Sequence, residues 1–486
     1  FRFNTPDCNG LGQLTGVAGQ ESALTFGNSA VLDLRNLYIT YVEAGGGITM
    51  PIDVVGADGG NNTNWNITNP LTGTTLYWVG GSGDWNDNAH WSASSGGPGG
   101  YCVPFSADDV VFDGNSGLTA GNNTVTTSSN IWCKNMTWTG ITGPAIFNES
   151  GTYALEVYGS LVMHPNVTMN AVAVFKGTEA STLTTNGSGT GAFGIEINRT
   201  GTNGGVTLTD DFVNPVSTVR LILGKWLMSG RTLDVNFFNS AVNGVRTIDM
   251  TNATVNVRET FAITGNGKTW VGNGAGLSIT SARYFNVAEI SIPTATLTSA
   301  EDVFDIRNCT FGTITFTNTA SNSNARILAN NTITTLEFKG SGNIAQTGNT
   351  IGTLLLAPSK YYGFTGTNTI NTHMRFNSPA CSGLGEMRGI NGVLSTLNFG
   401  PSATTDLANV YIQNMAATGS ITPLTVSGAD AGGNSGFVIN GSTGSARYWV
   451  GGNGDWNDAS HWSLTPGGAG GACIPTVNDD VFFNAQ

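Results

Sequence analysis

The chain has 486 residues, of which 39% are hydrophobic and only 10% are charged, and its formal net charge is −13 at pH 7. So few basic residues argue against a nucleic-acid-binding protein, which needs clustered Lys and Arg, and against binding to an anionic membrane surface. The chain also lacks the run of about 18 apolar residues that direct membrane insertion requires. Abundant Thr, Val, Asn and Gly favour short strands and tight turns, which predicts an all-β protein.

Two segments of the chain repeat one another. Residues 2–12, RFNTPDCNGLG, return as RFNSPACSGLG at 375–385, and residues 77–92, YWVGGSGDWNDNAHWS, return at 448–463. The repeat of about 370 residues is far longer than the usual solenoid period of about 20–50, so it indicates duplication of whole domains.

This repeat divides the chain into three expected parts. We expect residues 1–113 and 374–486 to be two copies of one β-rich module, with a segment of single occurrence, 114–373, between them. The chain begins at Phe1 with neither Met nor a signal peptide, so we interpret it as an internal fragment of a longer array.

The segment 114–373 consists of short alternating stretches such as ALEVYG, GIEINRT, TVRLILG and TLLLAP, each closed by Gly, Asn, Pro or Thr. Many of these stretches end in Asn or Gly, which tolerate positive φ at the corners of a solenoid. We therefore predict a right-handed parallel β-helix, and a β-sandwich remains the alternative. At about 20–30 residues per turn, the segment would form on the order of ten turns.

Each copy of the module carries a Trp block, which spans 77–113 in the first copy. Its tryptophans are Trp78, Trp85 and Trp91, with the equivalents Trp449, Trp456 and Trp462. The open edge of a β-helix must be covered, and one buried Trp hides about 150–250 Å², which contributes up to about 4–6 kcal/mol. We predict that the block is a structural cap at the start of the β-helix. Exposed rings that stack on sugars are the alternative.

The Trp block also supplies acidic side chains. Asp84 and Asp87, with the equivalents Asp455 and Asp458, are calcium candidates, because Ca²⁺ accepts Asp and Asn oxygens. The block lacks the D-x-D-x-D-G pattern of a calcium loop, and its single His is insufficient for zinc. We therefore expect no cofactor, with calcium as the one alternative.

Six cysteines lie at positions 8, 102, 133, 309, 381 and 473. The phase of the repeat favours the disulfides Cys102–Cys133 and Cys309–Cys381. The rival pairing, Cys8 with Cys102 and Cys381 with Cys473, respects the repeat equally. Either scheme predicts an oxidising, extracellular location.

No catalytic signature is present, so we expect a protein that is not an enzyme. Asp210 and Asp211 are neighbours on one strand, and their side chains therefore point to opposite faces. A polysaccharide-degrading β-helix enzyme is the alternative, with a cleft around Asp210, Asp211, Arg220 and Lys225.

The stretch YWVGGSGDWNDNAHWS, followed by VPFSADDVVFD, is similar to one found in very large repetitive surface proteins of Bacteroidota, where it leads into a β-helix. The chain thus resembles an internal fragment of the SprB-type gliding-motility adhesins, which are giant filaments exported by the type IX secretion system. The resemblance implies a structural or adhesive segment at the bacterial cell surface. Its partners would be neighbouring repeats and surface or polysaccharide ligands. A carbohydrate-binding module is a further alternative.

Overall fold

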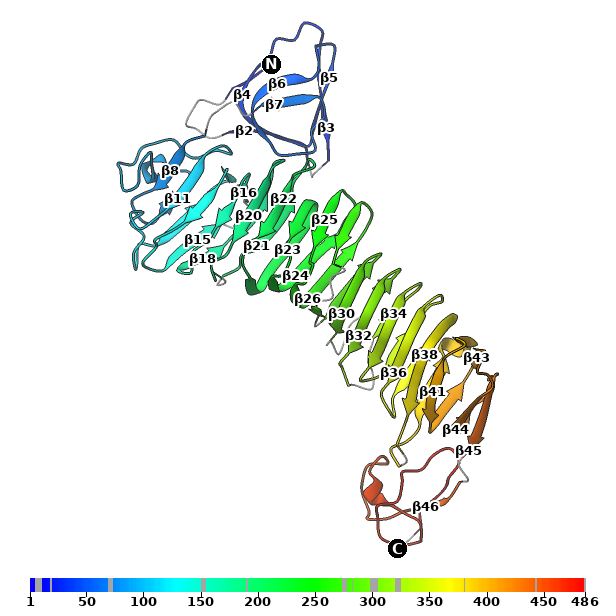
Figure 1. Cartoon of the computed structure of the whole chain (residues 1–486). Helices are drawn as coiled ribbons and strands as arrows, with labels where there is room; N and C mark the ends of the chain where they lie inside the picture. Colours follow the sequence, from blue (N-terminus) through cyan, green and yellow to red (C-terminus); the bar gives the residue numbers. More distant parts are fainter. Residues whose placement is uncertain are drawn as a thin grey trace. The chain divides into compact units, whose positions relative to one another are not determined.

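The computed structural model describes residues 1–4, 11–17, 20–68, 73–149, 154–188, 191–272, 278–281, 283–297, 305–319, 325–379, 381–441 and 444–484. The described residues form strands and a few short 3₁₀ turns but no α-helix. Together the strands build a parallel β-solenoid of about 18 turns, which confirms the predicted fold class (Figure 1). The right-handed coiling stays a prediction.

The coils form because alternate residues of successive strands point into one continuous interior. For example, β32 (Thr310–Phe316) pairs in parallel with β34 (Thr332–Phe338), which pairs with β36 (Thr350–Leu356). This register places similar side chains above one another, and the rings of Phe316 and Phe338 stack with centroids 4.7 Å apart. Parallel neighbours cannot be joined by a hairpin, so each connection must run around the coil.

Buried asparagines stabilise one corner of these coils. The Asn331 side-chain amide donates to Oδ1 of Asn349 at 2.9 Å, and the Asn349 amide donates to Oδ1 of Asn368 at 2.8 Å. The backbone N–H of Cys309 donates to Oδ1 of Asn331 at 3.0 Å. One polar side chain per turn thus satisfies the buried groups of its neighbours, as a closed interior requires.

The first compact unit comprises Phe1–Val257 and Gly265–Val271. Residues 1–68 form two small parallel sheets, made of β1 (Arg2–Asn4), β2 (Gly12–Thr15), β4 (Asp33–Thr40), β6 (Ile52–Asp58) and β7 (Trp65–Thr68), and of β3 (Ser22–Phe26) with β5 (Val42–Gly46). Phe26, Leu37 and Ile39 belong to the apolar core between these sheets.

The Trp block opens a second series of coils in the same unit. One face contains β8 (Thr75–Trp78), β10 (Trp91–Ser92), β11 (Asp109–Phe112), β14 (Met136–Trp138), β17 (Leu161–Val162), β20 (Ala180–Thr184), β22 (Gly205–Leu208), β25 (Arg246–Asp249) and β27 (Lys268–Val271). A second face contains β13 (Ile131–Cys133), β16 (Leu155–Val157), β19 (Val172–Phe175), β21 (Gly194–Asn198), β23 (Phe212–Leu227) and β24 (Thr232–Ala241). The third face contains β9 (Gly83–Asp84), β12 (Thr124–Thr127), β15 (Ala145–Glu149) and β18 (Val167–Asn170).

The second compact unit comprises Arg258–Thr264 and Gly272–Gln486, and β26 (Thr254–Thr264) contributes residues to both units. One series of its strands contains β28 (Ser278–Ser281), β29 (Tyr284–Ala288), β30 (Ser291–Leu297), β31 (Asp305–Arg307), β32, β34, β36, β38 (Thr367–Asn377), β40 (Ser395–Phe399), β41 (Thr404–Ala408) and β43 (Met415–Gly419). The other contains β33 (Arg326–Ile327), β35 (Gly342–Ile344), β37 (Tyr361–Phe364), β39 (Gly385–Gly389), β42 (Val410–Gln413), β44 (Leu424–Asp430) and β45 (Phe437–Gly441). The second Trp block adds β46 (Ala446–Trp449), β47 (Trp462–Ser463) and β48 (Asp480–Phe482).

The two copies of the duplicated sequence fold in the same register. In the first copy Arg2 pairs with Asp33 and Tyr38 with Ala57, and in the second copy Arg375 pairs with Asp406 and Tyr411 with Ala429. The cis peptide bond before Pro51 also recurs before Pro423.

The coils do not keep to the expected β-helix range of 114–373, and this expectation needs correction. The series of coils that contains this range begins with the first Trp block at β8, and the second-copy strands β39, β42, β44 and β45 continue the sheet of β37 as its last coils. The second Trp block forms a separate three-stranded sheet. The physical boundary therefore lies inside each module, between its coils and its Trp block.

Candidate functional site

The first Trp block is a closed aromatic cluster. Trp78, Trp85 and Trp91 are fully buried. Nε1 of Trp78 donates to the carbonyl of Gly81 at 2.7 Å, and Nε1 of Trp91 donates to the carbonyl of Trp85 at 2.7 Å. The ring of Trp91 meets the rings of Trp85 and Trp78 edge-on, with centroids 4.7 and 5.2 Å away. In this copy the rings face the interior, as a structural cap requires and as sugar stacking by exposed rings does not.

The His and Gly of the block support the same cluster. The ring of His90 stacks on Trp78 with centroids 4.7 Å apart, and its Nδ1 donates to the carbonyl of Val79 at 2.8 Å. A Cβ on Gly83 would lie 2.0 Å from Nε2 of His90, so only glycine fits there. The second block repeats this arrangement with His461 and Gly454.

The calcium candidates hold turns in place. Oδ1 of Asp84 accepts a hydrogen bond from the backbone N–H of Asn86 at 2.8 Å, and Asp87 caps the 3₁₀ turn η2 (Asn88–His90). Asp455 and Asp458 make the equivalent bonds in the second block, at 2.7 and 2.9 Å. In the part of the chain that the structure describes, no group of three His, Cys, Asp or Glu side chains could hold a metal ion. Calcium binding stays a prediction.

The coils that follow complete the first block. Phe112, the last residue of β11, is fully buried and stacks on Trp138 of β14 with centroids 3.9 Å apart. Phe147 of β15 approaches Trp85 edge-on at 6.1 Å. The block is therefore the first layer of the coil interior and not a detached lid.

The second Trp block presents part of the same cluster to solvent. Trp462 is fully buried, whereas Trp456 is 45% exposed and Phe483, the equivalent of Phe112, is 66% exposed. Phe483 lies 6.2 Å from Trp456 and 6.1 Å from Trp462 between ring centroids. An aromatic surface that coils cover in the first copy is thus open in the second.

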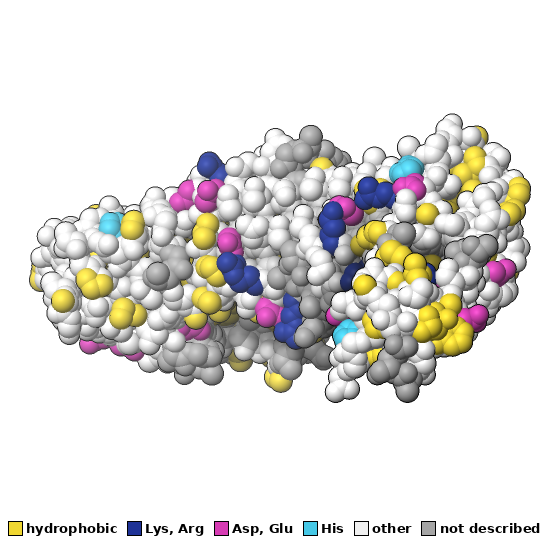
Figure 2. All heavy atoms as spheres, turned by 90° about the horizontal axis from the view of Figure 1, so that it is seen from below, with side chains coloured by type: hydrophobic (Ala, Val, Ile, Leu, Met, Phe, Trp, Pro, Cys, Tyr) yellow, Lys and Arg dark blue, Asp and Glu magenta, His cyan; other side chains and the backbone are white. Residues whose placement is uncertain are grey.

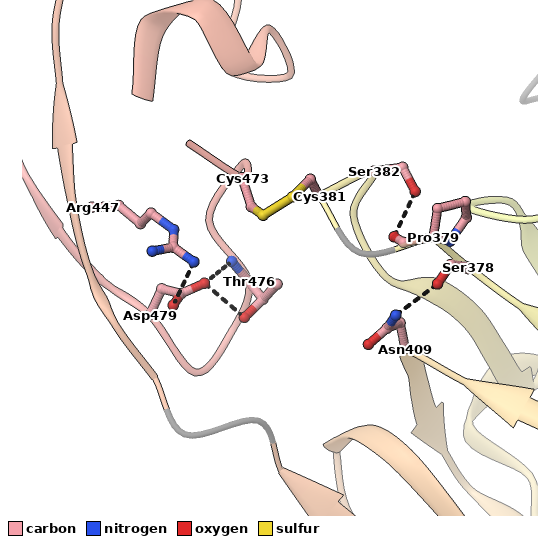
Figure 3. The surroundings of a disulfide bond; sticks show 9 residues. All are labelled: Ser378, Pro379, Cys381, Ser382, Asn409, Arg447, Cys473, Thr476 and Asp479. Carbon is pink, nitrogen blue, oxygen red and sulfur yellow. Dashed lines mark hydrogen bonds and ion pairs between the residues drawn. A yellow bond between two sulfur atoms is a disulfide. The ribbon is translucent and has the colours of Figure 1, made fainter. Parts of the chain in front are cut away.

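A disulfide links the last coils to the second Trp block. Cys381, in the turn between β38 and β39, is bonded to Cys473 (Figure 3). Beside it, the carboxylate of Asp479 accepts hydrogen bonds from the backbone N–H and the hydroxyl of Thr476 at 2.8 and 2.9 Å. Disulfides of this kind are typical of proteins outside the reducing cytoplasm.

The pairing that the repeat phase favoured is wrong. Cys133 and Cys309 are buried thiols, so neither Cys102–Cys133 nor Cys309–Cys381 forms. Cys133 points into the coil interior from β13, and Cys309 lies at the end of the row formed by Asn331, Asn349 and Asn368. Coil packing therefore determines both positions. The rival pairing holds for Cys381 and Cys473. Cys102 is disulfide-bonded as well, and its expected partner Cys8 lies outside the described residues.

A buried aspartate recurs in both blocks with opposite electrostatics. Burial raises the pKa of Asp108, although hydrogen bonds from Thr74 and Phe105 oppose this shift. Burial also acts on the equivalent Asp479, but hydrogen bonds from Thr476 and Ser445 and the charge of Arg447, 3.6 Å away, bring its pKa below the ordinary value. The first block has Leu76 at the position equivalent to Arg447.

A second buried site, which we name the clasp, joins residues 1–68 to the coils after the first Trp block. It consists of Tyr38, Glu156, Tyr158 and Lys176. Tyr38 donates to Oε1 of Glu156 at 2.8 Å, and Tyr158 donates to Oε2 at 3.2 Å. Nζ of Lys176 lies 3.9 Å from Oε1 of Glu156 and donates to the carbonyl of Gly59 at 3.0 Å.

Apolar side chains surround the clasp. Leu11, Tyr38, Ala57 and Trp132 form one buried cluster, in which the rings of Tyr38 and Trp132 lie 5.7 Å apart. Burial raises the pKa of Glu156, and Lys176 and the two tyrosine hydroxyls partly offset that shift. This site was not predicted from the sequence. The available signal was a Glu within one nearly apolar strand, β16, and a Lys directly after another, β19, in a chain with few charges.

The residues named for an enzymatic cleft have structural partners. Asp210 accepts hydrogen bonds from the backbone N–H groups of Thr185 and Asn186, and Asp211 accepts one from Thr232. Arg220 forms an ion pair with Glu196 at 3.2 Å. Lys225 lines a groove of about 390 Å³ whose other basic residues are Arg199 and Arg246.

The surface charge agrees with the composition. On the face shown in Figure 2, Lys and Arg side chains lie in several separate places and do not merge into one basic patch. Within the described ranges, no helix has the length and hydropathy of a membrane span. No protein-family model, no curated protein and no solved structure matches this chain.

Proposed function

We propose that this chain is a structural segment of an extracellular filament at a bacterial cell surface, and that it transmits tension and supports attachment or gliding. The observation that carries the proposal is the disulfide between Cys381 and Cys473, because it ties the last coils to the second Trp block, whose counterpart in the first copy opens a series of coils. The resemblance of the Trp blocks to those of giant repetitive adhesins supports the same role.

The internal repeat adds a mechanical argument. Coils with the same register recur in both copies of the duplicated segment, so coils can be added to such a stack without a new core. The buried cluster of Trp78, Trp85 and Trp91 supplies a large apolar area where the coils of the first Trp block begin. These properties suit a spacer segment that extends the reach of a cell-surface filament.

The experiment compares attachment with catalysis on the same chain. Beads coated with the chain through a C-terminal tag are brought to glass and to polysaccharide films, and their detachment force is measured. We expect attachment above that of beads coated with an unrelated acidic protein. Release of reducing ends from an acidic polysaccharide would contradict the proposal and would favour the β-helix enzyme instead.

A carbohydrate-binding module is the second candidate, because one groove has suitable chemistry. A hollow of about 370 Å³ beside the first Trp block is lined by amide and carboxylate side chains and by two indoles, from Gln13, Trp85, Asn86, Asp87, Asn88 and Trp132. Among the described residues, no acceptor lies within hydrogen-bond distance of the buried Nε1 of Trp85. Polar groups that converge in a hollow are typical of small-molecule sites, and because both indoles are buried these polar groups, and not stacking on exposed rings, would hold a sugar there.

Substitution of the groove tests this candidate. Glycan-array binding that is lost in Asn88→Ala, with thermal stability unchanged, would support it. The control is Ser460→Ala in the equivalent turn of the second block, η4 (Ala459–His461), which the hollow does not include. Equal glycan binding by native chain and Asn88→Ala would exclude the groove as the sugar site.

A further inference from the structure

The clasp of the first copy is an interface between the coils of one series and the opening coils of the next. Tyr38 from β4 is 4% exposed because Trp132 and Glu156, from the coils after the Trp block, cover it. Nζ of Lys176 adds a hydrogen bond that it donates to the backbone carbonyl of Gly59. Three side chains from successive coils therefore recognise one face of the preceding coils.

The second copy presents the same face. Tyr411, Ala429 and Leu384 are the equivalents of Tyr38, Ala57 and Leu11, and the strands that carry the first two pairs have the same register. Tyr411 and Leu384 are only half-buried, whereas their counterparts in the first copy are buried. We name the half-buried residues Leu384, Tyr411 and Ala431, together with the buried Ala429 beneath them, the open face.

Each copy has a hollow between the coils and the loop of its Trp block. In the first copy Leu11, Val103 and Trp132 line one hollow, so that the Trp ring packs beside the Trp-block loop. In the second copy Leu384 and Ile474, the equivalents of Leu11 and Val103, line a hollow of about 140 Å³ next to the disulfide. The disulfide holds the Trp-block loop beside the open face, as an interface with following coils requires.

The charges beside Tyr411 differ from those of the first copy but offset one another. The guanidinium of Arg388 lies 4.6 Å from the ring of Tyr411 and forms an ion pair with Glu386 at 2.7 Å. The first copy has the neutral residues Thr15 and Gln13 at these positions. The open face therefore keeps the net charge of its counterpart and suits the same occupant.

We infer that the open face docks the opening coils of a further solenoid, in which a Trp, a Glu and a Lys occupy the places of Trp132, Glu156 and Lys176. This occupant is a parallel β-coil of the same protein type, placed behind the second Trp block. Its Trp fills the hollow at Leu384, its Glu accepts from Tyr411, and its Lys donates to the carbonyl of Ala431. The inference rests on the proposed function of a continuing array.

The experiment extends the chain with its own sequence. Residues 485–486 are replaced by a second copy of residues 114–257, because Asp113 corresponds to Asn484. Hydroxyl-radical footprinting with mass spectrometry then measures the reactivity of Tyr411 in the native and the extended chain, and Tyr38 serves as the buried reference in both. We expect the reactivity of Tyr411 to fall to the level of Tyr38 in the extended chain only.

A matched variant makes the result specific. In this variant of the extended chain, the appended copies of Glu156 and Lys176 are changed to Gln and Met. We expect Tyr411 to stay more reactive than Tyr38 in this variant. If hydrogen exchange shows folded appended coils while Tyr411 keeps its native reactivity, the inference is wrong. The inference is also wrong if the appended coils do not fold, because unfolded coils would leave the rings of Trp456 and Phe483 exposed to solvent. Docking without attachment of coated beads would sustain the inference and refute the proposed function.

Discussion

The hydroxyl of Tyr38 donates a 2.8 Å hydrogen bond to Glu156 across 118 positions of sequence, and both side chains are buried. This bond joins two coil series that the sequence alone presents as separate modules. The carboxylate of Glu156 also forms an ion pair with Lys176, and both of these side chains are largely buried. The stability of the junction should therefore depend on each partner of the clasp.

Tyr38→Phe should lower the free energy of unfolding of residues 1–68 by about 1.5–3 kcal/mol, because the lost hydrogen bond has a charged acceptor. Glu156→Gln should cost about 3–5 kcal/mol, since it leaves the buried Lys176 without its carboxylate. Hydrogen exchange of β4 reports both effects. The matched control is Tyr411→Phe, for which we expect less than about 0.5 kcal/mol on the unextended chain. Equal effects at Tyr38 and Tyr411 would argue against the clasp.

Gly83→Ala should destabilise the first Trp block by about 1–3 kcal/mol, because the new Cβ would overlap the ring of His90. Near-ultraviolet circular dichroism during thermal unfolding follows the buried indoles directly. Gly27→Ala is the control, since nothing lies within 4 Å of a Cβ built there. A Gly83→Ala chain as stable as Gly27→Ala would show that His90 does not pack on Trp78.

The two blocks should respond to acid in opposite directions. The pKa of Asp108 is raised in the folded chain, so its contribution to stability is present below the ordinary pKa of about 3.9 and is lost as the pH rises through the folded pKa. The pKa of Asp479 is lowered, so its contribution is present above the ordinary value and is lost as the pH falls through the folded pKa.

The variants Asp108→Asn and Asp479→Asn separate these contributions. Between about pH 2.5 and 6, the stability advantage of the native chain over Asp108→Asn should shrink as the pH rises, and its advantage over Asp479→Asn should grow. Hydrogen exchange of β11 and β48 gives the local readout. Parallel pH profiles for the two variants would contradict the opposite environments of Leu76 and Arg447.

The disulfide should shield part of the chain from tension. Cys381 and Cys473 are separated by 92 residues, and about 3.5 Å per residue makes roughly 320 Å of chain that a pulling force cannot extend while the bond is intact. In single-molecule pulling without reductant, Cys381→Ser should be longer than the native chain by this amount at full extension. Native and Cys381→Ser chains of equal extended length would mean that the bond is absent.

The fold class could be predicted from sequence because each coil carries its own local pattern. Stretches such as TVRLILG alternate and end in turn residues, and the structure places this stretch in β23. The boundaries could not be predicted, because a tandem repeat in the sequence does not show at which residue each structural unit begins. Only the pairing of β37 with β39 shows that Gly385–Gly389 belongs to the last coils and not to the start of a new module.

Other features depend on contacts that no short pattern encodes. Cys309 is a buried thiol whose backbone N–H donates to Asn331 of the next coil, and the phase of the repeat carries no information about that corner. The clasp depends on the packing of Tyr38 against Trp132, which are far apart in the chain. The Trp block was accessible to sequence reasoning because all its parts, from Trp78 to His90 and Trp91, lie in one short motif.

Peptide mapping under non-reducing conditions decides whether a disulfide fastens the last coils to the second Trp block. Native chain is alkylated in denaturant without reductant, digested and analysed by mass spectrometry. We expect a linked Cys381–Cys473 peptide, a linked peptide that contains Cys102 and, by the repeat, Cys8, and alkylated Cys133 and Cys309. A linked Cys102–Cys133 or Cys309–Cys381 peptide would contradict this expectation.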